Sequence, residues 1–94
     1  MESVPQIAQK ELSKYLEDST AMIVDVRDEW EFRDFNIGGI NVPAHLLNEN
    51  LDQLKKYQTL IIVCSNGTRS HIMSRVIQKK LPEQTILHLE EGIF

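Results

Sequence analysis

The stretch LIIVCSNGTRSHIMSRVIQKKL, residues 60–81, determines how this chain must fold. It opens with four consecutive apolar residues, and such a run is typical of a strand buried on both faces of a sheet. It passes through the loop CSNGTRS, residues 64–70, into a segment with helical spacing that Pro82 ends. A buried strand that leads within a few residues into a helix predicts a parallel sheet covered by helices.

The rest of the chain repeats this alternation of short apolar runs and amphipathic segments. The expected strands are 21–26, 40–42, 60–63 and 85–89, and the expected helices are 10–17, 28–35, 47–57 and 69–81. Asp28 is the expected N-cap of the second helix. On the last helix we expect one buried stripe formed by Ile72, Met73, Val76, Ile77 and Leu81. The predicted fold class is α/β with three layers, a central and mostly parallel sheet with helices on both faces.

Length, charge and cysteine content narrow the kind of protein. The chain has 94 residues, enough for one domain, which we expect to be 1–94. The net charge is −4 and the basic residues form no stripe, so nucleic acid is not an expected partner. No apolar stretch is long enough to span a bilayer and the start does not resemble a secretory signal, so we expect no membrane and a cytoplasmic location. One cysteine excludes an internal disulfide.

We expect Cys64 to lie where this class of fold binds its ligands, at the carboxyl end of the most apolar strand. A thiolate is the reactive form of cysteine, and a free thiol has a pKa of about 8.5. Backbone N–H groups of the loop and the start of the next helix favour the anion. Gly67 permits a positive φ, Arg69 adds a fixed positive charge, and Ser70 can cap the helix or donate its hydroxyl to the loop.

A lone cysteine at a strand end is also commonly a small buried hydrophobic residue. The glycine, the arginine and the helix that follow Cys64 favour a reactive thiol instead. His45, His71 and His88 lack the spacing of metal ligands, so no metal is expected. The sequence leaves open a Cys–His dyad with His45 or His71.

The loop 64–70, CSNGTRS, resembles the C-R-x-G-x-R-S active-site loop of the rhodanese family of sulfurtransferases. A second stretch supports the likeness. It has DVR at 25–27, EF at 31–32 and NIGGINVP at 36–43, which is similar to the family's D-V-R…E-[YF]…H-I-x-G-A-x-N-[IV]-P. The resemblance covers residues 7–94.

The resemblance implies a sulfurtransferase in which Cys64 takes a sulfane sulfur from a donor such as thiosulfate or a persulfide. The Cys64 persulfide then passes the sulfur to a thiophilic acceptor such as cyanide, a small thiol or a protein thiol, with ping-pong kinetics. No metal or organic cofactor is required. The loop residues that would bind the anion are Ser65, Asn66, Gly67, Thr68, Arg69 and Ser70. Asp25 and Arg27 are expected to support the loop by pairing with each other and with Glu31.

Two alternatives to this function are considered. Related phosphatases and arsenate reductases place five residues between the cysteine and the arginine, whereas four separate Cys64 from Arg69. The shorter loop favours sulfur over phosphate or arsenate. A rhodanese-fold module that carries sulfur for a partner, without free turnover, is the main alternative.

The sequence departs from the family pattern at several positions. Ser65 replaces a frequent arginine and removes a cation from the pocket mouth, which favours the carrier alternative. Glu91 replaces the first glycine of a Gly-Gly pair, and the usual C-terminal helix is absent. We therefore expect either a shortened member of the family or a chain trimmed at its C-terminus.

Overall fold

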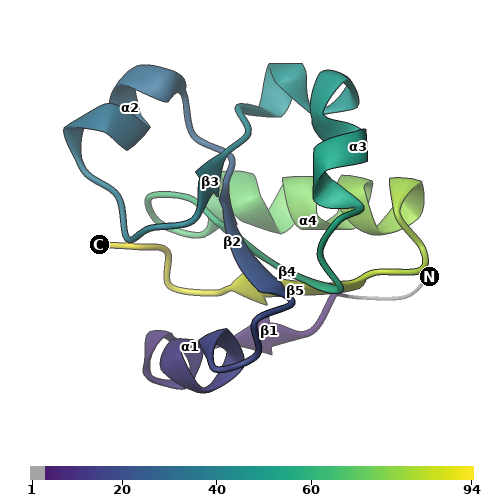
Figure 1. Ribbon diagram of the computed structural model, residues 1–94. Helices are drawn as coiled ribbons and strands as arrows, with labels where there is room; N and C mark the ends of the chain where they lie inside the picture. Colours follow the sequence, from purple (N-terminus) through teal and green to yellow (C-terminus); the bar gives the residue numbers. More distant parts are fainter. Residues whose placement is uncertain (1–3) are drawn as a thin grey trace.

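The computed structural model describes residues 4–94 and contains a five-stranded sheet whose paired strands are all parallel (Figure 1). The strands are β1 Gln6–Ile7, β2 Ala21–Asp25, β3 Ile40–Asn41, β4 Thr59–Val63 and β5 Thr85–Leu89. Their order in the sheet is β1-β5-β4-β2-β3, so β4 is the central strand. The predicted strands are confirmed. The loop that contains Cys64 follows the central strand.

Helices cover both faces of the sheet, which confirms the predicted three layers. They are α1 Gln9–Leu16, α2 Glu29–Asp34, α3 Leu51–Leu54 and α4 Thr68–Lys80, with 3₁₀ helices η1 Ala44–Leu46 and η2 Asn48–Asn50. Figure 1 shows α1 on one face and α3 and α4 on the other. The chain end marked C lies on the same side as α2 and the loop that leads into α4.

Two apolar clusters hold the layers together, and the alternation of each strand divides its residues between them. The cluster on the α4 side includes Val24, Leu60, Ile62, Cys64, Ile77 and Leu81. The cluster on the α1 side includes Ile23, Ile61, Val63, Leu87, Leu89 and Ile93. Residues 60–64 are wholly inaccessible to solvent, which explains the continuous apolar run in the sequence.

The predicted helix 47–57 is wrong in its extent, because the structure has a 3₁₀ turn followed by the short α3. The cause is local. Asn50 donates a hydrogen bond from its side chain to the Leu46 carbonyl at 2.9 Å, and such side-chain bonds compete with regular helix. The two-residue β1 was not predicted, because so short an edge strand carries no periodicity.

The predicted apolar stripe of α4 is wrong at Ile72, which is 59% exposed. The buried positions of α4 are Ser70, Ser74 and Ile77, at helical spacing. The helix is therefore rotated so that a serine, rather than an isoleucine, faces the loop.

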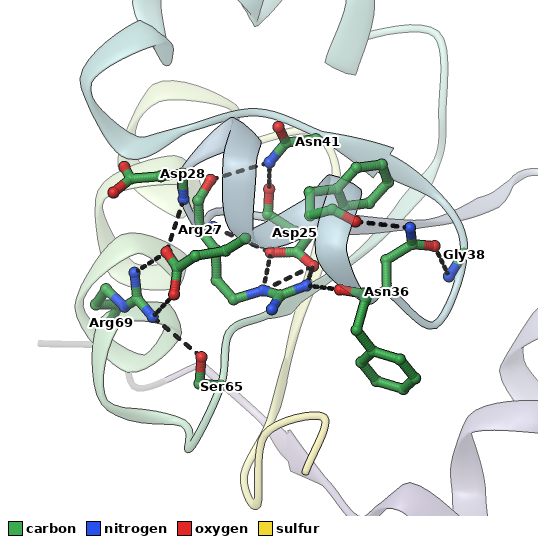
Figure 2. A network of polar contacts seen from close by, with 11 residues as sticks. Asp25, Arg27, Asp28, Asn36, Gly38, Asn41, Ser65 and Arg69 are labelled. Carbon is green, nitrogen blue, oxygen red and sulfur yellow. Dashed lines mark hydrogen bonds and ion pairs between the residues drawn. The ribbon is translucent and has the colours of Figure 1, made fainter.

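Asp25 and Arg27 form a buried ion pair at the end of β2, as predicted. Arg27 Nη2 lies 2.8 Å from Asp25 Oδ2 and also donates to the Phe35 carbonyl at 2.6 Å. Asn41 Nδ2 donates to the carbonyls of Asp25 and Arg27 at 3.0 and 2.9 Å (Figure 2). These contacts join the end of β2 to β3 and to the end of α2.

Arg27→Ala should lower the free energy of unfolding by about 3–5 kcal/mol, because it leaves the Asp25 carboxylate buried without its partner. Arg33→Ala is the matched control. Arg33 pairs with Glu29 at 3.5 Å, but both side chains are more than two-thirds exposed, and its loss should change stability little. Urea unfolding of the two variants checks this. Similar losses in both would show that the buried pair has no special weight.

Candidate functional site

The loop between β4 and α4 is a tight turn whose backbone points its amides inward. Cys64 directly follows β4, and Gly67 takes φ +90° at the N-cap of α4. Asn66 accepts a hydrogen bond from the Thr68 amide through Oδ1 at 3.1 Å. Ser70 does not cap the helix, whose N-cap is Gly67; its hydroxyl interacts with the loop instead. Ser70 lies inside α4 and turns its side chain back to the loop, with Oγ 3.3 Å from the Gly67 carbonyl.

The sulfur of Cys64 is surrounded by hydrogen-bond donors although the residue has no exposed surface. The Ser70 amide donates to Sγ at 3.2 Å, and Ser70 Oγ lies 3.3 Å from Sγ. Burial alone would raise the pKa of the Cys64 thiol. Hydrogen bonds from the hydroxyl and amide of Ser70, and then from the amides of Asn66 and Gly67, outweigh burial and lower that pKa. The arrangement stabilises a sulfur anion.

Two glycines allow the backbone after β5 to pack in close contact with this loop. A Cβ on Gly67 would lie 2.1 Å from the Glu90 carbonyl oxygen, and one on Gly92 would lie 2.3 Å from the Ser65 carbonyl oxygen. Both have positive φ. The Ile93 amide also donates to the Cys64 carbonyl at 3.0 Å. The backbone of the loop is therefore fixed from the β5 side as well as by α4.

The substitution of glycine by Glu91 is explained by where that side chain lies. Glu91 is exposed, and its Oε1 accepts a hydrogen bond from the Gln9 amide, the first residue of α1, at 2.9 Å. Gly92, the glycine that remains of the pair, is the one in close contact with the loop. The departure from the family pattern thus leaves the loop contact intact.

The guanidinium of Arg69 forms a bidentate ion pair with the carboxylate of Glu31. It donates to Glu31 through Nη1 at 2.8 Å and Nη2 at 3.0 Å, and Nη2 also donates to Ser65 Oγ at 3.1 Å (Figure 2). These Arg69 hydrogen bonds outweigh partial burial and lower the pKa of Glu31 to about 2. The expected pairing of Glu31 with Asp25 and Arg27 is therefore wrong: Glu31 joins α2 to the loop instead.

His88 on β5 is connected to Cys64 through Ser70. No functional role was expected for this histidine from the sequence. Its Nε2 lies 2.9 Å from Ser70 Oγ and 3.1 Å from the Gly67 carbonyl. His45 and His71 are both exposed, and the His71 ring packs at 5.5 Å from that of His88. The signal in the sequence was a polar residue inside the apolar run 85–89, since a buried polar group needs a partner.

Within residues 4–94, no group of three or more acidic, cysteine or histidine side chains is placed to hold a metal ion. No helix in the same range is long and apolar enough to cross a membrane.

Comparison with known proteins places this geometry in a family. The model of the rhodanese-like domain matches residues 8–94. A rhodanese-like domain protein from Staphylococcus aureus is 25% identical, with a TM-score of 0.80 over 95% of this chain and 87% of that one. No curated protein gave a significant sequence match.

Two larger proteins contain a similar part. A thiosulfate sulfurtransferase from Pseudomonas aeruginosa is 26% identical, with a TM-score of 0.81 over 95% of this chain and 18% of that one. An NAD-dependent persulfide reductase from A. fulgidus is 31% identical, with a TM-score of 0.72 over 96% of this chain and 15% of that one. This chain spans less than a fifth of either protein. With its parallel sheet, its loop after β4 and its match over nearly the whole sequence, the chain belongs to the rhodanese-like domain family.

Proposed function

We propose that this chain is a sulfurtransferase that carries a sulfane sulfur as a persulfide on Cys64. The observation that carries the proposal is the set of groups around Sγ: the Ser70 amide donates to it at 3.2 Å, and Ser70 Oγ lies 3.3 Å from it. Donors aimed at a buried sulfur stabilise its anion, and the anion is the nucleophile. Membership of the rhodanese-like domain family and similarity to a thiosulfate sulfurtransferase support the choice of sulfur chemistry.

The reaction has two displacement steps. The Cys64 thiolate attacks the outer sulfur of thiosulfate, the S–S bond of thiosulfate breaks, and sulfite leaves with the bonding electron pair. In the second step cyanide or an acceptor thiolate attacks the outer sulfur of the persulfide. The persulfide S–S bond then breaks and the Cys64 thiolate is restored. The same loop donors stabilise the anion at the start and the end of the cycle.

A persulfide donor is favoured over thiosulfate by the charges around the loop. Arg69 is a cation of the loop itself, but its guanidinium makes a bidentate pair with Glu31. Ser65 supplies no positive charge in place of the frequent arginine. A doubly charged anion such as thiosulfate therefore gains little attraction here. The carrier alternative rests on this observation and on the complete burial of Cys64.

Cys64 should gain one sulfur atom when the protein is incubated with a glutathione persulfide, and later addition of cyanide should release thiocyanate. Intact-protein mass spectrometry and thiocyanate assay measure the two steps, and Cys64→Ser is the control that removes only the sulfur nucleophile. Mass gain with negligible turnover would select the carrier alternative. No mass gain, or full activity in the variant, would reject the proposal. Hydrolysis of an aryl phosphate ester would instead indicate phosphatase chemistry.

The rate of alkylation by iodoacetamide should rise with pH around a midpoint well below the ordinary thiol value of about 8.5. The sign follows from the lowered pKa of Cys64, because a lowered pKa populates the reactive thiolate at lower pH. The chain has one cysteine, so the label reports this site alone. The same protein unfolded in urea is the internal control and should show an ordinary midpoint. Equal midpoints in the two states would mean that the loop does not stabilise the anion.

Ser65→Arg should raise kcat/KM for thiosulfate roughly fivefold, because a cation a few ångströms from a bound anion near the surface contributes about 1 kcal/mol. The control is Ser65→Gln, which adds length without charge and should give no gain. Steady-state thiocyanate formation with both variants measures the effect. An equal gain in the glutamine variant would attribute it to shape rather than charge.

A further inference from the structure

Three residues from three parts of the fold form one hydrogen-bonded chain that ends at the reactive sulfur. Cys64 follows β4, Ser70 lies in the first turns of α4, and His88 is on β5. Ser70 Oγ is 3.3 Å from Cys64 Sγ and 2.9 Å from His88 Nε2. All three residues are buried, with exposed fractions of 0% for Cys64 and Ser70 and 3% for His88. Water therefore does not compete for these contacts.

The Ser70 hydroxyl has one hydrogen and two acceptors at equal distance. Its oxygen lies 3.3 Å from the sulfur of Cys64 and 3.3 Å from the carbonyl oxygen of Gly67. Only a hydrogen directed at the sulfur stabilises an anion there. Distance alone does not select between the two, so the choice depends on what else surrounds the two acceptors.

The tautomer of His88 follows from its neighbours. Burial lowers the pKa of His88, so the ring is neutral near pH 7 and carries one N–H. Nε2 faces the Gly67 carbonyl oxygen at 3.1 Å, and a carbonyl oxygen only accepts hydrogen bonds. The hydrogen must therefore be on Nε2. Nδ1 is buried without a partner, and an unpaired acceptor is tolerated better than an unpaired N–H.

With the hydrogen on Nε2, the Gly67 carbonyl oxygen is fully used. It accepts from the His71 amide at 3.0 Å and faces the His88 Nε2–H at 3.1 Å. A carbonyl oxygen has two lone pairs, and both are now engaged. The same Nε2–H also points to Ser70 Oγ, which can only accept from it. The Ser70 hydrogen is then left for the sulfur of Cys64.

From this geometry we infer that His88 is a positioning residue: through Nε2–H it holds the Ser70 hydroxyl as a hydrogen-bond donor to the Cys64 sulfur. The inference rests on the proposed function of Cys64, because the donor matters only if the sulfur works as an anion. His88 does not touch the sulfur and transfers no proton in this role. It acts by occupying the Gly67 carbonyl oxygen, so that the Ser70 hydroxyl does not donate its hydrogen to that oxygen.

The test is the pH profile of Cys64 alkylation in His88→Leu, Ser70→Ala and the double variant. Each single variant should move the midpoint up by about one pH unit, a tenfold loss of thiolate below the midpoint, because a hydrogen bond to a charged group is lost. In the Ser70→Ala background the leucine substitution should add nothing, since its effect passes through the hydroxyl. His45→Leu is the control, because it replaces an exposed histidine, one that lies outside the loop and α4, and it should leave the midpoint unchanged.

A conservative pair of variants keeps the test valid if leucine disturbs the strand. His88→Gln places an amide N–H near the position of Nε2 and should keep the midpoint within a few tenths of a pH unit of the natural protein. His88→Asn places its amide near Nδ1 and should raise the midpoint as leucine does. An unchanged midpoint in both His88→Leu and His88→Asn would overturn the inference. So would an equal shift with and without Ser70, which would mean that His88 acts on the sulfur directly.

Failure of this inference can be told apart from failure of the proposed function. Alkylation needs a thiolate but no sulfur donor. A shifted profile in His88→Leu, in a protein that gains no sulfur from a persulfide donor, would reject sulfur transfer and support the positioning role. Normal sulfur loading with an unchanged profile would do the opposite.

Discussion

The close packing of the chain after β5 against the loop after β4 is the constraint on which the rest of the site depends. Gly67 and Gly92 have no room for a side chain, because a Cβ on either would lie within 2.3 Å of a carbonyl oxygen of the other segment. Two peptide segments at this distance fix each other's orientation. The fixed loop can then aim its amides at Cys64, and it also brings the Gly67 carbonyl within reach of His88. A looser contact would leave the sulfur buried but without its donors.

Neutral groups, rather than cations, do most of the anion stabilisation at this site. Both arginines near the loop are paired with carboxylates, Arg27 with Asp25 in the interior and Arg69 with Glu31 at the surface. The groups next to the sulfur are the Ser70 amide, which donates to it, and the Ser70 hydroxyl, which lies 3.3 Å from it. Such dipoles are already oriented before any donor arrives, and they do not attract anions from a distance as an unpaired charge does. The site is therefore suited to stabilise charge on its own sulfur better than to collect charged substrates.

Sequence patterns were sufficient for the sheet and for the position of the loop, because continuous apolar runs and strand–helix alternation are local signals. The strands at 60–63 and 85–89, the helix that ends before Pro82 and the place of Cys64 all follow from them. The pairing of Glu31 with Arg69 could not be read in this way, since 38 positions separate the two residues. The prediction that Ile72 is buried was wrong for a related reason. Apolar spacing defines a stripe on α4, but the rotation of that helix is set by Ser70, whose partners lie just after β4 and on β5. His88 was hidden in the apolar run by the same long-range dependence.

Complete burial of Cys64 is compatible with a reactive thiol because two physical effects act on different properties of the sulfur. Exclusion of water opposes ionisation, yet it leaves an ionised sulfur with few solvent molecules to displace before attack. The loop donors restore ionisation without restoring bulk water. Access then requires part of the loop to move. The outer contact joins Arg69, whose side chain is 43% exposed, to Glu31, and water can replace the hydrogen bonds that the guanidinium loses when this contact opens. The inner contacts through Ser70 are buried and costly to lose, so opening at the outer side can admit a donor while the sulfur keeps the groups that hold its charge.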